Sequence, residues 1–450
     1  FEAASNNFRS DATTFQQVLD WGHPFRDVIQ FALPNFYGNP SHHTIFDVFT
    51  GQTVPLTVNA LGEARFHTEW GIKNYVEAAL YVGILPLILS VYGFIGKSVG
   101  TGHTLSSEKD MNARREGAKK DAPGERRDQV IFLILALFSL TVMFGLPTYA
   151  ILYYTLPGID QLHSPFRWVF GVTLSIAVLA GFGADKLFNG ERLHRLIGGI
   201  LIALGSVIGI GLIASRLLYD QLTADIITSV FESMALATTG FPDARAFYSY
   251  QAINIGIFAL VLIASGVVFL TRWRLFAVLL IAADLMIASY SFNPASDPAW
   301  LDHTPPSIAW LQSQPGEWRY TSYEDQTQAF SQVFNANMTL RYGLDDVRGY
   351  ESIIPLSYVE FMRELAPQVQ LDFNRVAPIY AYYPAELNFD PRTALESEML
   401  DLLNVRFVIT QTTTDLAALD YALAYEDSAV RIWENPGWRE RAWLESASGE

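Results

Sequence analysis

Residues 196–214 read LIGGILIALGSVIGIGLIA, and this uncharged run decides the fold class. A helix of about 20 apolar residues is long enough to cross the roughly 30 Å hydrocarbon core of a bilayer. In lipid, a helix satisfies all of its own backbone hydrogen bonds. A run this long and this apolar therefore predicts a membrane-spanning helix.

Five other runs share this character. The chain of 450 residues is 50% hydrophobic and only 17% charged, whereas ordinary soluble domains are about 25% charged. Because the apolar residues are bunched, we predict a multispan α-helical membrane protein with six spans. The predicted spans are residues 75–96, 129–146, 168–184, 196–214, 251–270 and 275–291.

The distribution of Lys and Arg predicts how the spans are oriented. Thirteen of the 30 basic residues lie in loop 97–128 and in the short turns after the third and fifth spans, whereas loop 147–166 has none. Cytoplasmic loops carry an excess of Lys and Arg. We therefore expect a multi-pass protein of the bacterial cytoplasmic membrane with residues 1–74 and 292–450 on the extracytoplasmic side.

Composition excludes several classes of function. The chain has no Cys, so it has no disulfides, thiolate metal sites or iron–sulfur clusters. Its net charge of −16 argues against nucleic acid as a partner. The chain begins at Phe1 without the features of a signal peptide, and we expect it to be a piece of a longer protein.

Three domains are expected: an extracytoplasmic loop at 1–74, the six-span domain at 75–291, and an extracytoplasmic α+β domain at 292–450. Within the loop, apolar positions at helical spacing over 24–33 predict a short amphipathic helix, and a second is expected around 224–236. In the last domain, helices are predicted at 305–314, 357–365 and 393–403, and strands at 319–323, 406–410, 422–425 and 429–433.

Three carboxylates are candidates for catalysis: Glu77, Glu69 and Asp160. Glu77 opens the first predicted span, where an ionisable group is costly unless it faces protein or water. The alternative for Glu77 is a structural hydrogen bond. Asp284 lies near the middle of the sixth predicted span, and a structural role, such as a bond to a Tyr or a pair with an Arg, is favoured for it.

Two cations are candidates for binding a lipid phosphate. Arg167 and His163 lie at the outer mouth of the third predicted span, in the sequence HSPFR. A guanidinium can hold a phosphate through two parallel hydrogen bonds. The alternative is that Arg167 only anchors the helix at the interface.

We expect no resident cofactor. Binding of a divalent cation remains an open alternative. The histidines match no metal-binding spacing, and His67 with Glu69 gives only a weak pair of ligands.

Short motifs along most of the chain resemble the YfhO family of bacterial membrane proteins. They are LPNFYG at 33–38, NYVE at 74–77 and YVG at 81–83. They continue with HxPxR at 163–167, LAGxG at 179–183, YG at 342–343, GY at 349–350, LLNVRFV at 402–408, WENP at 433–436 and RA at 441–442. The family is similar to the GT-C glycosyltransferases, which transfer a sugar from a polyprenyl phosphate outside the cytoplasmic membrane.

The resemblance implies a membrane glycosyltransferase that acts on a cell-surface acceptor such as lipoteichoic acid. Its partners would be a polyprenyl-phosphate-linked sugar and membrane lipids. The resemblance also implies that the family's catalytic acid lies upstream of Phe1 and that further strands and a last span follow Glu450. Two alternatives stay open: a non-catalytic subunit or scaffold of a larger membrane complex, with protein subunits as partners, and a transporter. Transport is the least favoured, because no matched pair of broken helices is evident.

Overall fold

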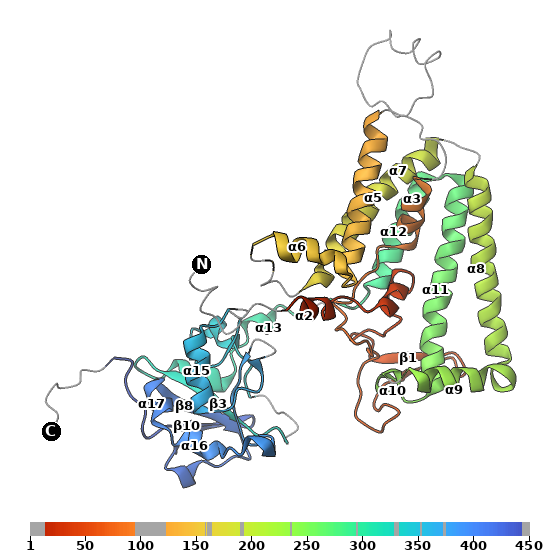
Figure 1. Cartoon of the computed structure of the whole chain (residues 1–450). Helices are drawn as coiled ribbons and strands as arrows, with labels where there is room; N and C mark the ends of the chain where they lie inside the picture. The colour runs from red at the N-terminus through yellow and green to blue at the C-terminus, as the bar shows by residue number, and fades with distance from the viewer. Residues whose placement is uncertain are drawn as a thin grey trace, which may run out of the picture. The chain divides into compact units, whose positions relative to one another are not determined.

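The computed structural model describes residues 14–94, 123–157, 159, 164–189, 193–234, 236–293, 296–327, 333–351, 353–371 and 375–442 (Figure 1). Two compact units divide the chain. One spans Thr13–Ala295 and the other contains Ser296–Glu450.

Three helices in the described ranges are long and apolar enough to cross a membrane: Pro165–Phe188, His194–Leu217 and Ala244–Thr271. They correspond to helix α7 (Val169–Asn189) with the 3-10 turn η4 (Pro165–Trp168), to α8 (Leu193–Leu217) and to α11 (Ala244–Thr271). A fourth span results only if helix α5 (Pro123–Met143) is joined to the segment Pro147–Thr155 across a bend of 105°. That segment contains η2 (Pro147–Tyr149) and α6 (Ala150–Thr155).

The prediction of six spans is therefore wrong, and the cause is local. Helix α3 begins only at Ile84, because Gly83 has a φ of 88°, and α3 (Ile84–Tyr92) has nine residues. Helix α12 (Arg274–Ala288) has 15 residues, and Ser291 just beyond it has a positive φ of 62°. At about 1.5 Å per residue, both fall short of a roughly 30 Å hydrocarbon core.

Helices α8 and α11 pack through small residues. A Cβ on Gly205 would come within 2.6 Å of the Ala259 carbonyl oxygen, and one on Gly266 would come within 2.7 Å of the Gly198 carbonyl oxygen. Close approach of this kind is common where helices meet in membranes. Gly209, in contrast, faces open space.

The remaining elements of this unit are short. They are α2 (Phe15–Asp20), η1 (Phe25–Phe31), the antiparallel hairpin of β1 (Thr44–Asp47) and β2 (Gln52–Pro55), the π-helical turn η5 (Tyr219–Thr223), α9 (Ala224–Ser233) and α10 (Ala237–Gly240). The amphipathic helix predicted at 24–33 is a 3-10 helix that buries Asp27 and Gln30. The helix expected around 224–236 is confirmed as α9.

The second unit is an α+β domain built on a mixed sheet in the order β4-β3-β8-β10-β9, with β7 also paired to β3. The strands are β3 (Arg319–Glu324), β4 (Asp345–Asp346), β7 (Ile379–Tyr380), β8 (Val405–Gln411), β9 (Ala422–Glu426) and β10 (Val430–Glu434). Strand β3 runs parallel to β4, β7 and β8, whereas β8, β10 and β9 are antiparallel. The four predicted strands are thus confirmed.

Alternating residues of β8 supply the two cores of this domain. Phe407 and Ile409 pack with α14 (Pro306–Gln312), while Val408 packs with α15 (Leu356–Leu365), α16 (Pro391–Leu395) and α17 (Glu398–Leu402). The helix predicted at 393–403 is split into α16 and α17. The shorter elements are α13 (Ala299–Asp302), η6 (Met338–Tyr342), the pair β5 (Gly349–Tyr350) and β6 (Arg375–Val376), η8 (Ala385–Leu387) and η9 (Ala417–Leu419).

Candidate functional site

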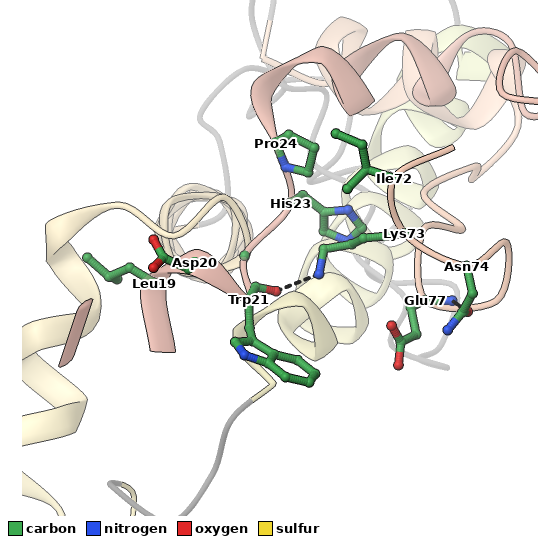
Figure 2. Close-up of a pocket in the computed structure, with 10 residues that line it drawn as sticks. Leu19, Asp20, Trp21, His23, Pro24, Ile72, Lys73, Asn74 and Glu77 are labelled. Carbon is green, nitrogen blue, oxygen red and sulfur yellow. Dashed lines mark hydrogen bonds between the residues drawn. The ribbon is translucent and has the colours of Figure 1, made fainter. Parts of the chain in front are cut away.

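A cavity of about 470 Å³ lies in the first unit, between the end of α2 and the chain that leads to α3 (Figure 2). Two segments line it: residues 19–24, and residues 72–74 with Glu77. A cavity of this volume is in the range of small-molecule sites, roughly 300–1,000 Å³.

Two glycines let the first of these segments lie tightly against the end of α5. A Cβ on Gly22 would come within 2.7 Å of the Gly145 backbone nitrogen, and Gly145 itself has a φ of 63°. Next to this contact, the His23 backbone N–H donates to the Met143 carbonyl at 2.8 Å. The backbone of His23 is therefore held in place by the chain where α5 ends.

His23 and Asp27 form a buried pair beside the cavity. The His23 Nδ1 lies 3.1 Å from Asp27 Oδ2, and the two side chains are 0% and 5% exposed. The other ring nitrogen, Nε2, is buried and has no hydrogen-bond partner in the described part of the chain. A carboxylate on one nitrogen fixes the orientation of the imidazole and leaves the other nitrogen free to exchange a proton.

Lys73 brings a cation to the same cavity. Its Nζ donates to the Trp21 carbonyl at 2.8 Å, as Figure 2 shows, and lies 4.9 Å from the centre of the Phe166 ring. An ammonium has three donors, so further donors are left for a ligand. Burial lowers the pKa of Lys73, and the nearby carboxylates of Glu77 and Asp27 partly oppose this shift.

Glu77 lines the cavity from a turn that precedes α3, and not from the first turn of a span as predicted. Its backbone N–H donates to Asn74 Oδ1 at 2.9 Å. The side chain is half-buried, and within the described ranges its carboxylate makes no hydrogen bond. Glu77 thus offers a free carboxylate next to Lys73.

Glu69 lies in a different environment. Its Oε1 accepts a hydrogen bond from the Tyr75 N–H at 2.7 Å, and it lines a much smaller cavity that shares Ile72 and Lys73 with the first. Its backbone carbonyl accepts from Arg65. The carboxylate therefore has a structural partner already.

Arg167 does not line the cavity. Its side chain is exposed, its guanidinium carbon lies 5.9 Å from the centre of the Phe166 ring, and no carboxylate pairs with it in the described part of the chain. Lys73 contacts the same ring, so the two cations share one aromatic neighbour. Asp160 and His163, the other predicted site residues, lie outside the described residues.

Asp284 has a structural role. From α12, its Oδ2 accepts from the Ile84 backbone N–H at 2.9 Å, and its Oδ1 accepts from the Tyr81 hydroxyl at 2.5 Å. The carboxylate thus satisfies a backbone donor at the beginning of α3. The predicted bond to a Tyr is confirmed.

The His23–Asp27 pair was missed from the sequence. The signal is the i,i+4 spacing, which places two side chains on one face of a helical turn, but a lone His–Asp spacing is common. What reveals the pair is the cavity beside it.

No group of three or more His, Asp or Glu residues that could hold a metal ion is found in the ranges that the structure describes. No family model matches the chain, and no curated protein and no solved structure shows significant similarity to it.

Proposed function

We propose that the protein is a membrane glycosyltransferase of the GT-C type, which transfers a sugar from a polyprenyl phosphate to an extracytoplasmic acceptor. One observation carries the proposal: a single cavity is lined by Glu77, Lys73 and His23, and the His23 ring is paired with the buried Asp27 beside it. A general base next to a cation is the arrangement that sugar transfer from a lipid phosphate requires. The short motifs shared with the YfhO family support the same reading.

The roles follow from exposure and charge. As the acceptor oxygen bonds to C1 of the sugar, the C1–O bond to the phosphate breaks and its electron pair leaves with the lipid phosphate. The Glu77 carboxylate takes the proton of the acceptor hydroxyl, because it is half-exposed and makes no hydrogen bond within the described chain. Lys73 stabilises the departing phosphate.

Two other groups assist. Asp27 positions the His23 ring, whose buried Nε2 has no hydrogen-bond partner among the described residues, and we assign this nitrogen a supporting role in proton exchange. Arg167 is exposed, and its guanidinium carbon lies 5.9 Å from the centre of the Phe166 ring. There it would attract the donor phosphate without contacting it at the moment of transfer.

The test is a transfer assay in proteoliposomes. The full chain is supplied with polyprenyl phosphates that carry radiolabelled glucose, galactose or N-acetylglucosamine, together with membrane extract as the source of acceptor. Glu77→Gln should lower the rate by about 10²–10⁴-fold, as expected for loss of a general base. Glu232→Gln, on an exposed position of α9, serves as the matched control and should leave the rate unchanged.

Two results would contradict the proposal. One is unchanged transfer in Glu77→Gln. The other is the absence of transfer from all three donors by the unaltered chain, which would favour the non-catalytic subunit instead.

A further inference from the structure

A second polar cavity, of about 280 Å³, lies within the α+β domain. Its lining comes from the carboxyl ends of neighbouring parallel strands. Glu324 ends β3, Tyr380 ends β7, and Arg348 follows two residues after the end of β4. In sheets with parallel strands, ligands bind beyond these carboxyl ends. The topology therefore places this cavity where the fold offers a site.

The base of the cavity is a buried ionic cluster. The Arg348 guanidinium contacts Glu324 at 3.1 Å and Asp346 at 2.8 Å, and all three side chains are at most 4% exposed. Its Nη1 also donates to Ser322 Oγ at 2.7 Å and to the Phe334 carbonyl at 2.9 Å. Arg348 is thus fully engaged, and it holds Glu324 in a fixed position at the cavity wall.

Several polar groups at the rim are still available. Arg375 has no carboxylate partner in the described part of the chain, and neither Asn335 nor the Gln370 side-chain oxygen has a hydrogen-bond partner there. Gln370 donates its amide to the Tyr380 hydroxyl. The free groups therefore include donors and acceptors close together, which suits a ligand whose own groups both donate and accept.

An aromatic surface completes the rim. Tyr350 pairs with Arg375 across β5 and β6, and the guanidinium carbon lies 5.4 Å from the centre of the Tyr350 ring. The Tyr350 side chain is still 51% exposed. The negative face of such a ring attracts the slightly positive C–H groups of an apolar surface.

The charges around the cavity favour a neutral ligand over an anion. The formal charges of Arg348, Arg375, Glu324 and Asp346 sum to zero. In addition, residues 292–450 carry 24 acidic residues against ten Arg and no Lys, and a surface of this sign repels anions. A hydroxyl-rich neutral ligand matches these groups, because hydroxyls both donate and accept and its C–H face can lie on Tyr350.

We propose that this cavity is a saccharide-binding site that holds one neutral sugar ring, with Arg375, Asn335 and Gln370 on its hydroxyls and Tyr350 against its C–H face. The volume suits a single ring, since it lies just below the roughly 300–1,000 Å³ of sites for drug-sized ligands. The proposal does not depend on transfer chemistry in the other unit. A non-catalytic chain could bind sugar here as well.

The test is saturation-transfer difference NMR with the full chain in lipid nanodiscs. Sugar-based detergents are avoided, because they would compete. The probes are glucose, galactose, N-acetylglucosamine and their β-linked disaccharides, with inorganic phosphate and acetate in competition experiments. At least one sugar should give a signal, and neither anion should displace it.

Variants locate the binding. Arg375→Ala and Asn335→Ala alter exposed side chains, so folding should be kept. Each should weaken sugar binding by roughly tenfold, the usual loss for one good hydrogen bond. Arg363→Ala, on an exposed position of α15 outside the cavity, is the matched control and should bind as the unaltered chain does.

Three results would overturn the site. They are the absence of a signal from any sugar at millimolar concentration, sugar binding that neither cavity variant weakens, and displacement of the sugar by phosphate or acetate. The transfer assay is read separately, so failure of one proposal leaves the other standing.

Discussion

At the scale of single residues, Lys73 makes a prediction about pH. Burial lowers its pKa below the ordinary value for a Lys. Above its pKa the side chain loses the charge that would stabilise the departing phosphate. Transfer should therefore fall as pH rises, at a lower pH than an exposed Lys would give. An Arg stays charged throughout this range, so Lys73→Arg should move the alkaline loss to higher pH.

The measurement is the pH profile of the transfer rate for both forms, with the substrate-free stability of each followed in parallel. Lys73→Ala should lose activity at all pH values, and by more than Arg167→Ala, because Lys73 lines the cavity and Arg167 does not. An alkaline limb that is identical in Lys73→Arg and the unaltered chain would assign the pH dependence to another group.

Arg348 makes a prediction about stability. Although burial opposes its charge, the Asp346 carboxylate raises the pKa of Arg348, which therefore stays ionised. Removing one member of a buried pair leaves the others uncompensated, at a cost of about 3–5 kcal/mol. Arg348→Ala should thus destabilise the α+β domain by about that much, which limited proteolysis of the full chain would show as early cleavage within 296–442. Arg363→Ala should not change the cleavage pattern.

Only part of the candidate site could be predicted from the sequence alone. Glu77 was found because an acidic group beside an apolar run is costly, and it does line the cavity. Its place in a turn was missed, since the backbone that surrounds it depends on Gly83 and on the distant Asp284, which caps α3 from another helix. The i,i+4 spacing of His23 and Asp27 was too common a signal to single them out, because the cavity beside them is formed with Lys73, some 50 residues along the chain.

At the scale of elements, the contact between α8 and α11 predicts different effects on stability for substitutions at two glycines of α8. From the sequence, Gly205 and Gly209 together form a small-xxx-small pattern, but only Gly205 lies at the contact. Gly205→Val would force side-chain atoms into the Ala259 backbone, and overpacking of this kind costs typically about 1–3 kcal/mol. Gly209→Val makes the same chemical change in the same helix where there is open space, so it should be close to neutral. Thermal unfolding of both variants in nanodiscs measures the difference, and equal loss in the two would place the contact elsewhere.

The elements that were predicted well from the sequence are those in which apolar residues recur at a clear helical or strand spacing. Strands β3, β8, β9 and β10 were predicted within a residue or two, and so was helix α15. The membrane spans were predicted less well, because the hydropathy of a run does not indicate where the backbone stops being helical. Gly83, with a positive φ, interrupts the run 75–96, which was predicted as a continuous helix, whereas Gly145, also with a positive φ, lies just after the end of α5. The parallel pairing of β3 with β4 and β7, which builds the sugar-sized cavity, involves strands of only two residues that have no period to detect.

At the scale of the whole molecule, the number of spans governs the sides on which the ends lie. Three spans place residues before α5 and residues after α12 on opposite sides of the membrane, whereas four spans place them on the same side. The basic bias of loop 97–128 favours the cytoplasm for that loop. The candidate spans all begin after residue 122, so residues 14–94 lie on the same side as that loop unless the chain also crosses the membrane at α3. The proposed function requires that crossing, because it needs the cavity of residues 19–77 outside, and an odd number of spans after the loop then places residues 296–442 outside as well.

The absence of Cys makes this question direct to test. Single cysteines are placed at Thr53 in β2, at Ser313 after α14 and at Ser107 in the basic loop, and intact cells are treated with a maleimide that cannot cross membranes. Thr53 and Ser313 are exposed, so lack of labelling would reflect their side of the membrane and not burial. We expect Thr53→Cys and Ser313→Cys to label in intact cells, and Ser107→Cys to label only after the cells are made permeable. Protection of Ser313→Cys in intact cells, as for Ser107→Cys, would mean an even number of spans after loop 97–128, and the α+β domain would then face the cytoplasm, where an extracytoplasmic acceptor could not reach its sugar-sized cavity. Protection of Thr53→Cys would place the cavity of residues 19–77 in the cytoplasm and contradict the proposed function.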